Sequence, residues 1–122
     1  LTSAPELNIL TYRYMPAAAR QALAGADADT VARINGLLNG ITRDIQRLQR
    51  DAGKSFVSRT QLGLARYGDE AIDVFRVVLA NPLTDRQVLR EVLTEQRGIA
   101  ASPALAARRA ELHALLAPAA AV

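Results

Sequence analysis

Cysteine is absent from this chain of 122 residues, while histidine and lysine occur once each, as His113 and Lys54. Without cysteine the chain has no disulfide framework, no thiolate nucleophile and no zinc site built on sulfur. A single histidine likewise excludes a metal site that depends on several imidazoles. We therefore expect no metal-binding residue in this chain.

Long hydrophobic runs are also missing, because none approaches the ~20 residues that a transmembrane helix needs. No cationic start precedes an apolar segment, so the sequence predicts a cytoplasmic location without membrane contact. The net charge is +3, but Arg108-Arg109 is the only block of consecutive basic residues. A nucleic-acid partner is not expected, since it would need a clustered basic surface.

The familiar catalytic motifs are absent as well: the chain contains no G-x-G-x-x-G, no Walker-type loop and no G-x-S-x-G. Lys54 follows the glycine that should end a helix, where solvent rather than a Schiff-base site is expected. His113 has no orienting carboxylate at helical spacing and is predicted to be a partly exposed helical residue. The sets of catalytic, cofactor-binding and metal-binding residues are therefore predicted to be empty, and the chain alone is not a complete enzyme.

What is present is a globular composition, with half of the residues hydrophobic. The length suits one domain over residues 1–122. Alternating apolar residues predict three strands, and apolar residues three and four apart predict three helices. The strands are expected at residues 6–14, 54–62 and 71–80, and the helices at 27–51, 84–98 and from 102 onward.

Capping signals define these helices. Asp27 and Asp29 should cap the long helix at its start, and Gly53 should end it with a left-handed residue. Thr84 and Gln87 are interpreted as a capping box. Gly36 and Gly40 lie close to the apolar stripe of the long helix, where they are expected to admit a neighbouring backbone. The alanine-rich stretch 16–24 is interpreted as an interruption, residues 63–70 as a polar loop, and Asn81-Pro82 as the end of the third strand.

This order predicts an α+β fold, in which helices pack on one face of a small, mainly antiparallel three-stranded sheet. The third strand should be central or covered, because it is apolar on both sides. The second face of such a sheet stays open. Where strands are apolar on both sides, that face is expected to meet another domain, another subunit or a ligand.

Each predicted strand holds an arginine near its middle: Arg13, Arg59 and Arg76. For Arg13 and Arg59 we favour outward-facing side chains paired with Asp or Glu across strands. Arg76 is interpreted as the one fixed charge of the apolar segment 72–82. A half-buried guanidinium keeps its proton and needs an anion, which is either a structural carboxylate or a substrate.

Several stretches together resemble the carboxy-terminal domain of the pyridoxal-phosphate-dependent amino-acid decarboxylases. They are ELNILTYRYMP (6–16), RINGLLNGITRDIQRLQRDAG (33–53), SFVSRTQL (55–62), VFRVVLANPLT (74–84) and LREVLTEQRGIA (89–100). VSRT and FRVVLANPLT look most like the bacterial aspartate 1-decarboxylase branch, with glutamate decarboxylase as the near alternative. The likeness covers nearly the whole chain up to about Ala100.

The resemblance implies a fold-type I enzyme that converts aspartate to β-alanine, or glutamate to GABA. Pyridoxal 5′-phosphate would be bound by a large domain of the same polypeptide, upstream and absent here, in a parent enzyme that is a homodimer. This chain would close over the active site, with Arg76, in the F-R-hydrophobic-hydrophobic pattern before Asn-Pro, binding a substrate carboxylate. No role is carried over to Arg13 or Arg59. The start at LTSAPELNILTYRY, without an initiator methionine, also favours a fragment.

Two other hypotheses remain open. The chain could be a free-standing α+β module whose arginine-bearing sheet face binds a small acid or a partner protein. It could also be a purely structural dimerisation domain. An upstream domain bearing the cofactor lysine would separate the first hypothesis from these two.

Overall fold

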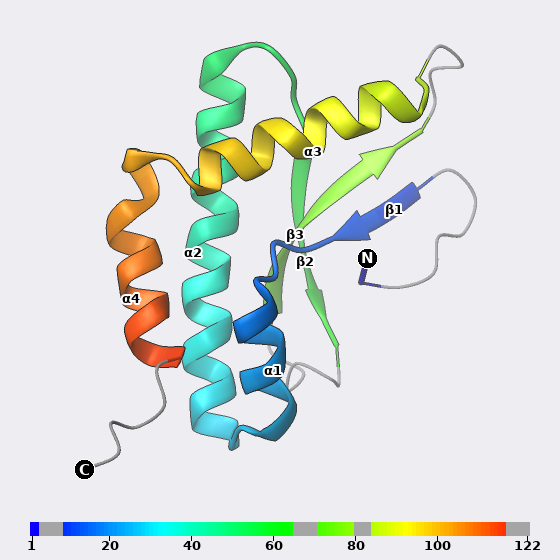
Figure 1. Ribbon diagram of the computed structural model, residues 1–122. Helices are drawn as coiled ribbons and strands as arrows, with labels where there is room; N and C mark the ends of the chain where they lie inside the picture. Colours follow the sequence, from blue (N-terminus) through cyan, green and yellow to red (C-terminus); the bar gives the residue numbers. More distant parts are fainter. Residues whose placement is uncertain (3–8, 65–70, 80–83, 117–122) are drawn as a thin grey trace.

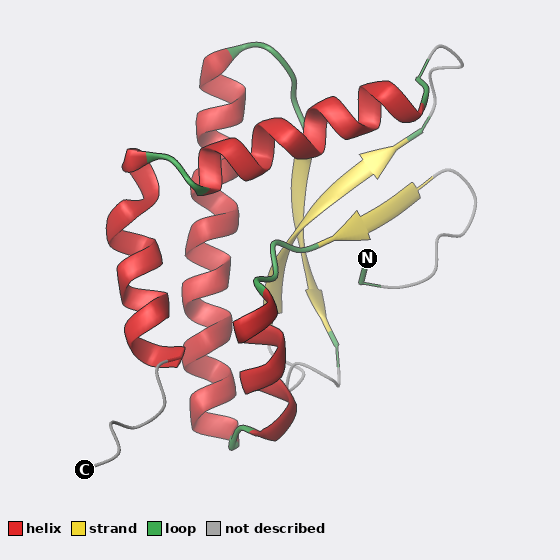
Figure 2. Ribbon diagram, viewed as in Figure 1, coloured by secondary structure: helices red, strands yellow, loops and turns green. Residues whose placement is uncertain are grey.

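The computed structural model describes residues 1–2, 9–64, 71–79 and 84–116, and it has the predicted α+β architecture (Figures 1 and 2). Helices cover one face of a three-stranded antiparallel sheet, as expected. The elements run β1 (Ile9–Tyr12), α1 (Ala17–Gly25), α2 (Ala28–Ala52), β2 (Ser58–Gly63), β3 (Ala71–Val78), α3 (Arg86–Ala100), a 3-10 turn η2 (Pro103–Leu105) and α4 (Ala106–Leu116).

The central strand is β3, which pairs with β1 on one side and β2 on the other. Tyr12 is opposite Phe75, and Thr11 is opposite Arg76. On the other side Ser58 is opposite Arg76. Because side chains alternate along a strand, Phe75 and Tyr12 share the face that the helices cover, while Arg76 shares the opposite face with Thr11 and Ser58.

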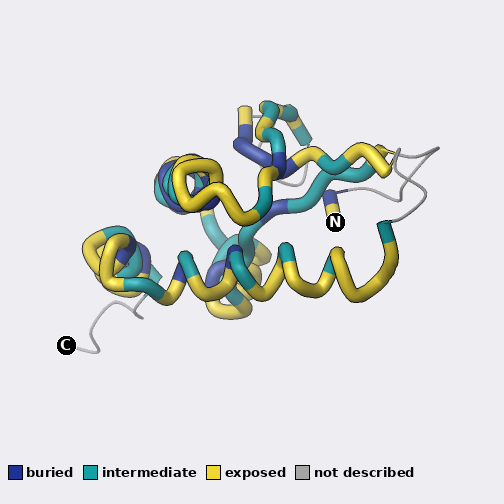
Figure 3. The backbone as a smooth tube through the Cα atoms, turned by 90° about the horizontal axis from the view of Figure 1, so that it is seen from above, coloured by how far each residue is buried: buried dark blue, intermediate teal, exposed yellow. Residues whose placement is uncertain are grey.

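The long helix α2 is the centre of the core and lies between α4 and the sheet (Figure 1). Its predicted apolar stripe supplies Ile34, Leu38, Ile41 and Ile45, each at most 1% exposed. They pack with Phe75, and the rings of Phe75 and Tyr12 lie 5.1 Å apart. The outer sides of the helices are exposed, whereas the residues between helices and sheet are buried (Figure 3). Asp27 caps α2 through Thr30 N, as predicted.

The expectation for residues 16–24 was wrong, because Ala17–Gly25 forms the helix α1. Pro16 precedes it with φ −60°, the angle to which its ring confines it. Alanine has the highest helix propensity, and Ala19 is completely buried. A run of small residues without strong amphipathicity can therefore form a helix when a neighbouring surface covers it.

The start of α3 also differs from the prediction. Asp85, rather than Thr84, is its N-cap and accepts from Val88 N at 2.9 Å. Gln87 donates to Glu91 instead of closing a capping box. The helix passes through Gly98 to Ala100, where Arg109 of α4 donates to the carbonyls of Ala100 and Ser102.

The strands are shorter than the sequence indicates. Residues 13–14 and 54–57 are not in strands, and Gly63 belongs to β2. The predicted strand residues 6–8, most of the polar loop and the Asn81-Pro82 stop lie outside the described residues. The last helix begins as predicted at Ser102-Pro103, but its first turn is the 3-10 turn η2.

Gly36 and Gly40 of α2 were expected to admit a neighbouring backbone, and neither does so. A Cβ on Gly36 would meet nothing within 4 Å. A Cβ on Gly40 would lie 2.9 Å from Arg108 Cζ, so Gly40 admits a guanidinium rather than a backbone. This space lets Arg108 Nε donate to Asp44 at 2.6 Å and tie α4 to α2.

Two glycine substitutions should change the free energy of unfolding in opposite directions, and so test the backbone conformation assigned to each glycine. Gly53 ends α2 with φ 72°, where a Cβ is strained, so Gly53→Ala should lower the free energy of unfolding by about 1 kcal/mol. Gly98 lies inside α3 with open space around it, so Gly98→Ala should raise that energy by up to about 1 kcal/mol. Urea unfolding measures both. Equal changes of the same sign would contradict the assignment.

Candidate functional site

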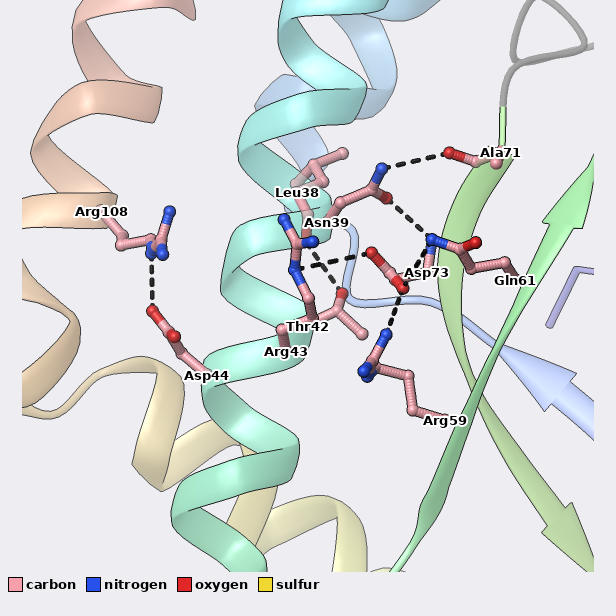
Figure 4. A network of polar contacts seen from close by, with 10 residues as sticks. All are labelled: Leu38, Asn39, Thr42, Arg43, Asp44, Arg59, Gln61, Ala71, Asp73 and Arg108. Carbon is pink, nitrogen blue, oxygen red and sulfur yellow. Dashed lines mark hydrogen bonds and ion pairs between the residues drawn. The ribbon is translucent and has the colours of Figure 1, made fainter.

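A buried carboxylate organises the helix-covered side of β3. Asp73 is 0% exposed and accepts from Arg59 Nη1 of β2 at 2.6 Å (Figure 4). Arg43 Nε of α2 lies 3.8 Å from its second oxygen. Gln61 Nε2 lies 3.5 Å from Oδ1 of Asp73, the oxygen that Arg59 also contacts. One carboxylate therefore joins the central strand to its neighbour and to the long helix.

The amide of Asn39 completes this attachment at the backbone. Its Oδ1 accepts from Asp73 N at 2.8 Å, and its Nδ2 donates to Ala71 O at 3.2 Å (Figure 4). Strand β1 pairs with β3 only from Phe75 to Val78, so within the described residues this stretch of β3 has no strand on that side. The side chain of Asn39 takes the place of a strand peptide and satisfies the two backbone groups.

Sequence reasoning missed this cluster because it treated Arg76 as the charge of an otherwise apolar segment. Asp73 lies in the same strand, three residues earlier. A carboxylate inside an apolar strand requires cationic or hydrogen-bonding partners, and this signal was present in the sequence. The partner Asn39 could not be found the same way, because it lies on another element with no distinctive spacing.

Arg76 lies on the opposite side of the sheet from Asp73. It is exposed, not half-buried as expected. No described residue forms an ion pair with its side chain. Its neighbours on this face include the exposed side chains of Ile9 (45%) and Val78 (51%), which are opposite each other across β1 and β3. Phe56, just before β2, is 62% exposed. Arg76 therefore stands beside exposed apolar groups where this face is open, whereas Ile72 and Val74, earlier on the same face of β3, are 0% exposed.

The other two arginines lie on the helix-covered side. Arg59 has the predicted carboxylate partner across strands, Asp73, but on the face that the helices cover. The outward-facing prediction for Arg13 was wrong. Strand β1 ends at Tyr12, and Arg13 turns inward, is 9% exposed and donates to Asn35 Oδ1 of α2 at 2.9 Å. The three arginines therefore do not form one site.

A chain of hydrogen bonds connects β1 to α3 and to the end of α2. Tyr12 donates to Gln96 at 2.7 Å, Gln96 to Gln49 at 3.1 Å, Gln49 to Ser55 at 2.8 Å, and Ser55 to Glu95 at 2.5 Å. Burial raises the pKa of Tyr12 to about 12, although the hydrogen bond to Gln96 partly opposes this effect. The chain fastens α3 to the sheet and to α2.

Lys54 and His113 are the first groups to consider for a cofactor or a metal. Lys54 is exposed just beyond the C-cap of α2, as predicted, so the residues present do not fit the Schiff base of pyridoxal phosphate. His113 is exposed on α4. Within the described ranges, no three His, Asp or Glu side chains gather as a metal would require. No helix there, α2 included, is long and apolar enough to cross a membrane.

A segment of a known decarboxylase matches this chain. The curated protein is named aspartate 1-decarboxylase, from Aliivibrio fischeri, and it is 50% identical over 102 residues. The match covers 84% of this chain but only 19% of that protein, so the chain spans about a fifth of the relative's length. No family model matches the chain, and no solved structure matches it. The chain is thus related to part of an enzyme of the carboxy-lyase type.

Removing the buried carboxylate should destabilise the fold strongly. Asp73→Asn leaves Arg59 and Arg43 without their anion and should lower the free energy of unfolding by about 3 kcal/mol. The matched control is Asp51→Asn, whose pair with Arg50 is exposed and should contribute less than about 1 kcal/mol. Urea unfolding compares the two variants. Similar losses would show that Asp73 is not the central attachment.

The pKa of Tyr12 predicts a loss of stability at high pH. The neutral phenol is favoured in the folded protein, so its contribution is complete below pH 10 and is lost as the pH rises toward about 12. Absorbance at the tyrosinate band should include a late step from Tyr12, and Tyr12→Phe should remove that step. A late step that persists in Tyr12→Phe would assign it to another tyrosine.

Proposed function

We propose that this chain is the small, carboxy-terminal domain of a pyridoxal-phosphate-dependent decarboxylase of acidic amino acids, and that Arg76 binds a carboxylate of the substrate. The observation that carries the proposal is the 50% identity to a segment of an aspartate 1-decarboxylase, combined with the exposure of Arg76. The relative's name favours aspartate, and glutamate is the alternative substrate. The cofactor and the catalytic lysine would belong to the remainder of a longer polypeptide.

The position of Arg76 suits this role for electrostatic reasons. A guanidinium stays charged at any physiological pH and can contact both oxygens of a carboxylate. No described carboxylate is paired with Arg76, so an incoming acid would not have to displace an internal partner. Thr11 and Ser58 are opposite it on the neighbouring strands, and Ser58 Oγ donates to Arg76 O at 2.9 Å. This hydrogen bond helps to hold the backbone that carries the arginine.

The surroundings of Arg76 support contact with a second protein surface. Ile9, Val78 and Phe56 expose apolar area that a covering domain would remove from water, at about 25 cal/mol per Å² buried. We infer that the large domain of the same polypeptide covers this face and places Arg76 at the edge of the active site. Excluding water there would strengthen the attraction between the guanidinium and the substrate. A homodimer of the parent enzyme and a cytoplasmic location belong to the same proposal.

Kinetics of the full-length polypeptide test the role of Arg76. Arg76→Gln should lower kcat/KM for aspartate by at least about tenfold, because a charged contact to the substrate is lost. Cofactor binding should persist, since no residue of this chain is assigned to it. Arg90→Gln, which removes the same charge from the exposed surface of α3, is the control and should leave kcat/KM unchanged. Unchanged kcat/KM in Arg76→Gln would remove Arg76 from the substrate site.

The alternative is a stand-alone binding or dimerisation module, which the apolar residues around Arg76 also suit. The 122-residue chain distinguishes the two in solution. A stable dimer in sedimentation, with Arg76→Gln still fully active in the longer polypeptide, would favour dimerisation. Binding of acidic amino acids at micromolar concentration by this chain alone would favour the binding module.

A further inference from the structure

Strand β2 forms one edge of the sheet, because among the described residues it pairs with β3 on one side and with no strand on the other. The opposite edge, β1, is partly covered, since Thr2 donates to Thr11 O through both its backbone N and its Oγ1. No backbone segment of the described chain bonds to β2 in this way. The outward-facing N–H and C=O groups of β2 can therefore pair with a further strand.

The sequence of β2 lacks the features that usually keep an exposed edge from pairing with another chain. It contains no proline and no lysine. It has no bulge, because its pairing with β3 continues one to one from Ser58 to Gly63. Its one charged side chain, Arg59, lies on the helix-covered side and is bound to Asp73 at 2.6 Å. Nothing in this strand opposes the addition of a partner strand.

The strand is complementary to a second copy of itself. A two-fold axis perpendicular to the sheet would pair two copies of β2 antiparallel, with residues of the same face opposite each other. With the axis at Thr60, the two Thr60 side chains are opposite each other, Arg59 is opposite Gln61, and Ser58 is opposite Leu62. Paired threonines are a favourable cross-strand contact. An axis at Arg59 would instead place two guanidinium groups opposite each other, which is unfavourable.

The flanking apolar residues favour the same register. Phe56, which precedes β2, is 62% exposed, and Leu64 directly follows the strand. In an extended chain both lie on the side of Thr60, whereas Val57 points to the other side and belongs to the core. With the axis at Thr60, Phe56 of each copy faces Leu64 of the other. An axis one residue further along would place Ser58, and not Phe56, opposite Leu64.

We propose that two copies of this chain associate through β2, paired antiparallel about Thr60. The strand order β1-β3-β2 of one copy then continues into β2-β3-β1 of the other, and the two sheets become one. The contact is a single strand pair with two apolar ends, so we expect weak association with a Kd of about 0.1 mM. The proposal is independent of the decarboxylase function, because pairing at this edge leaves the face around Arg76 open.

Cysteine substitution tests the register directly, since the chain has no cysteine of its own. In Thr60→Cys the two Cα atoms would lie about 5 Å apart across the axis, within the reach of a disulfide. In Ser58→Cys, on the same side of the strand, they would lie about 14 Å apart, which no disulfide spans. Under mild oxidation Thr60→Cys should form a covalent dimer and Ser58→Cys should not. A mixture of Ser58→Cys and Leu62→Cys should cross-link as a heterodimer.

Sedimentation equilibrium of the 122-residue protein tests the association itself. The average mass should rise toward twice the monomer mass as the concentration approaches about 1 mM. Thr60→Lys places two like charges opposite each other at the axis and should weaken association by about tenfold or more. Val78→Lys adds the same charge to the same face, on β3 and away from this edge, and should associate like the unaltered protein. Urea unfolding checks that both lysine variants are folded.

Several results would overturn the proposal. These are a protein that stays monomeric at about 1 mM, equal cross-linking of Thr60→Cys and Ser58→Cys, or undiminished association of Thr60→Lys. Loss of association in Val78→Lys but not in Thr60→Lys would assign the dimer to the face around Arg76 and would contradict pairing through β2. Arg76→Gln should leave the association unchanged, which separates this edge from the proposed substrate contact.

Discussion

The attachment of Asp73 is the constraint on which the rest of the structure depends. A carboxylate at 0% exposure is costly unless cations and hydrogen-bond donors surround it, and here they come from β2 and α2. Asn39 fixes the backbone on both sides of Ile72 at the same point. The register of β3 is thereby set, since a shift by one residue would exchange its two faces. Arg76, three residues further on, is then required to lie on the opposite face.

The two faces of β3 thus differ in their surroundings. The covered face joins helices and strands through Asp73, Phe75 and the hydrogen-bond chain that begins at Tyr12. The opposite face presents Arg76 among exposed apolar side chains, although Ile72 and Val74 on that face are buried. In the proposed function, the covered side supplies stability and Arg76 on the other side would offer a charge to a substrate.

The regular elements could be predicted because their signals are local. The apolar stripe of α2, its cap Asp27 and the left-handed Gly53 all follow from neighbouring residues. What failed depends on contacts between distant elements. Arg13 was placed on an outward face because strand β1 was expected to continue beyond Tyr12. The strand ends at Tyr12, and the guanidinium of Arg13 donates a hydrogen bond to Asn35. Ala17–Gly25 was missed because burial against a neighbour, rather than periodicity, supports that helix.

Chemical modification of arginines in the full-length polypeptide, with and without aspartate, tests the central claim most directly. Phenylglyoxal labelling followed by mass spectrometry reports the accessibility of each guanidinium. The account predicts that Arg76 reacts in the free enzyme, that aspartate protects it, and that Arg13 and Arg59 react slowly in both conditions because they are buried or bonded to Asp73. Labelling of Arg76 that is unaffected by aspartate, or faster labelling of Arg59 than of Arg76, would contradict it.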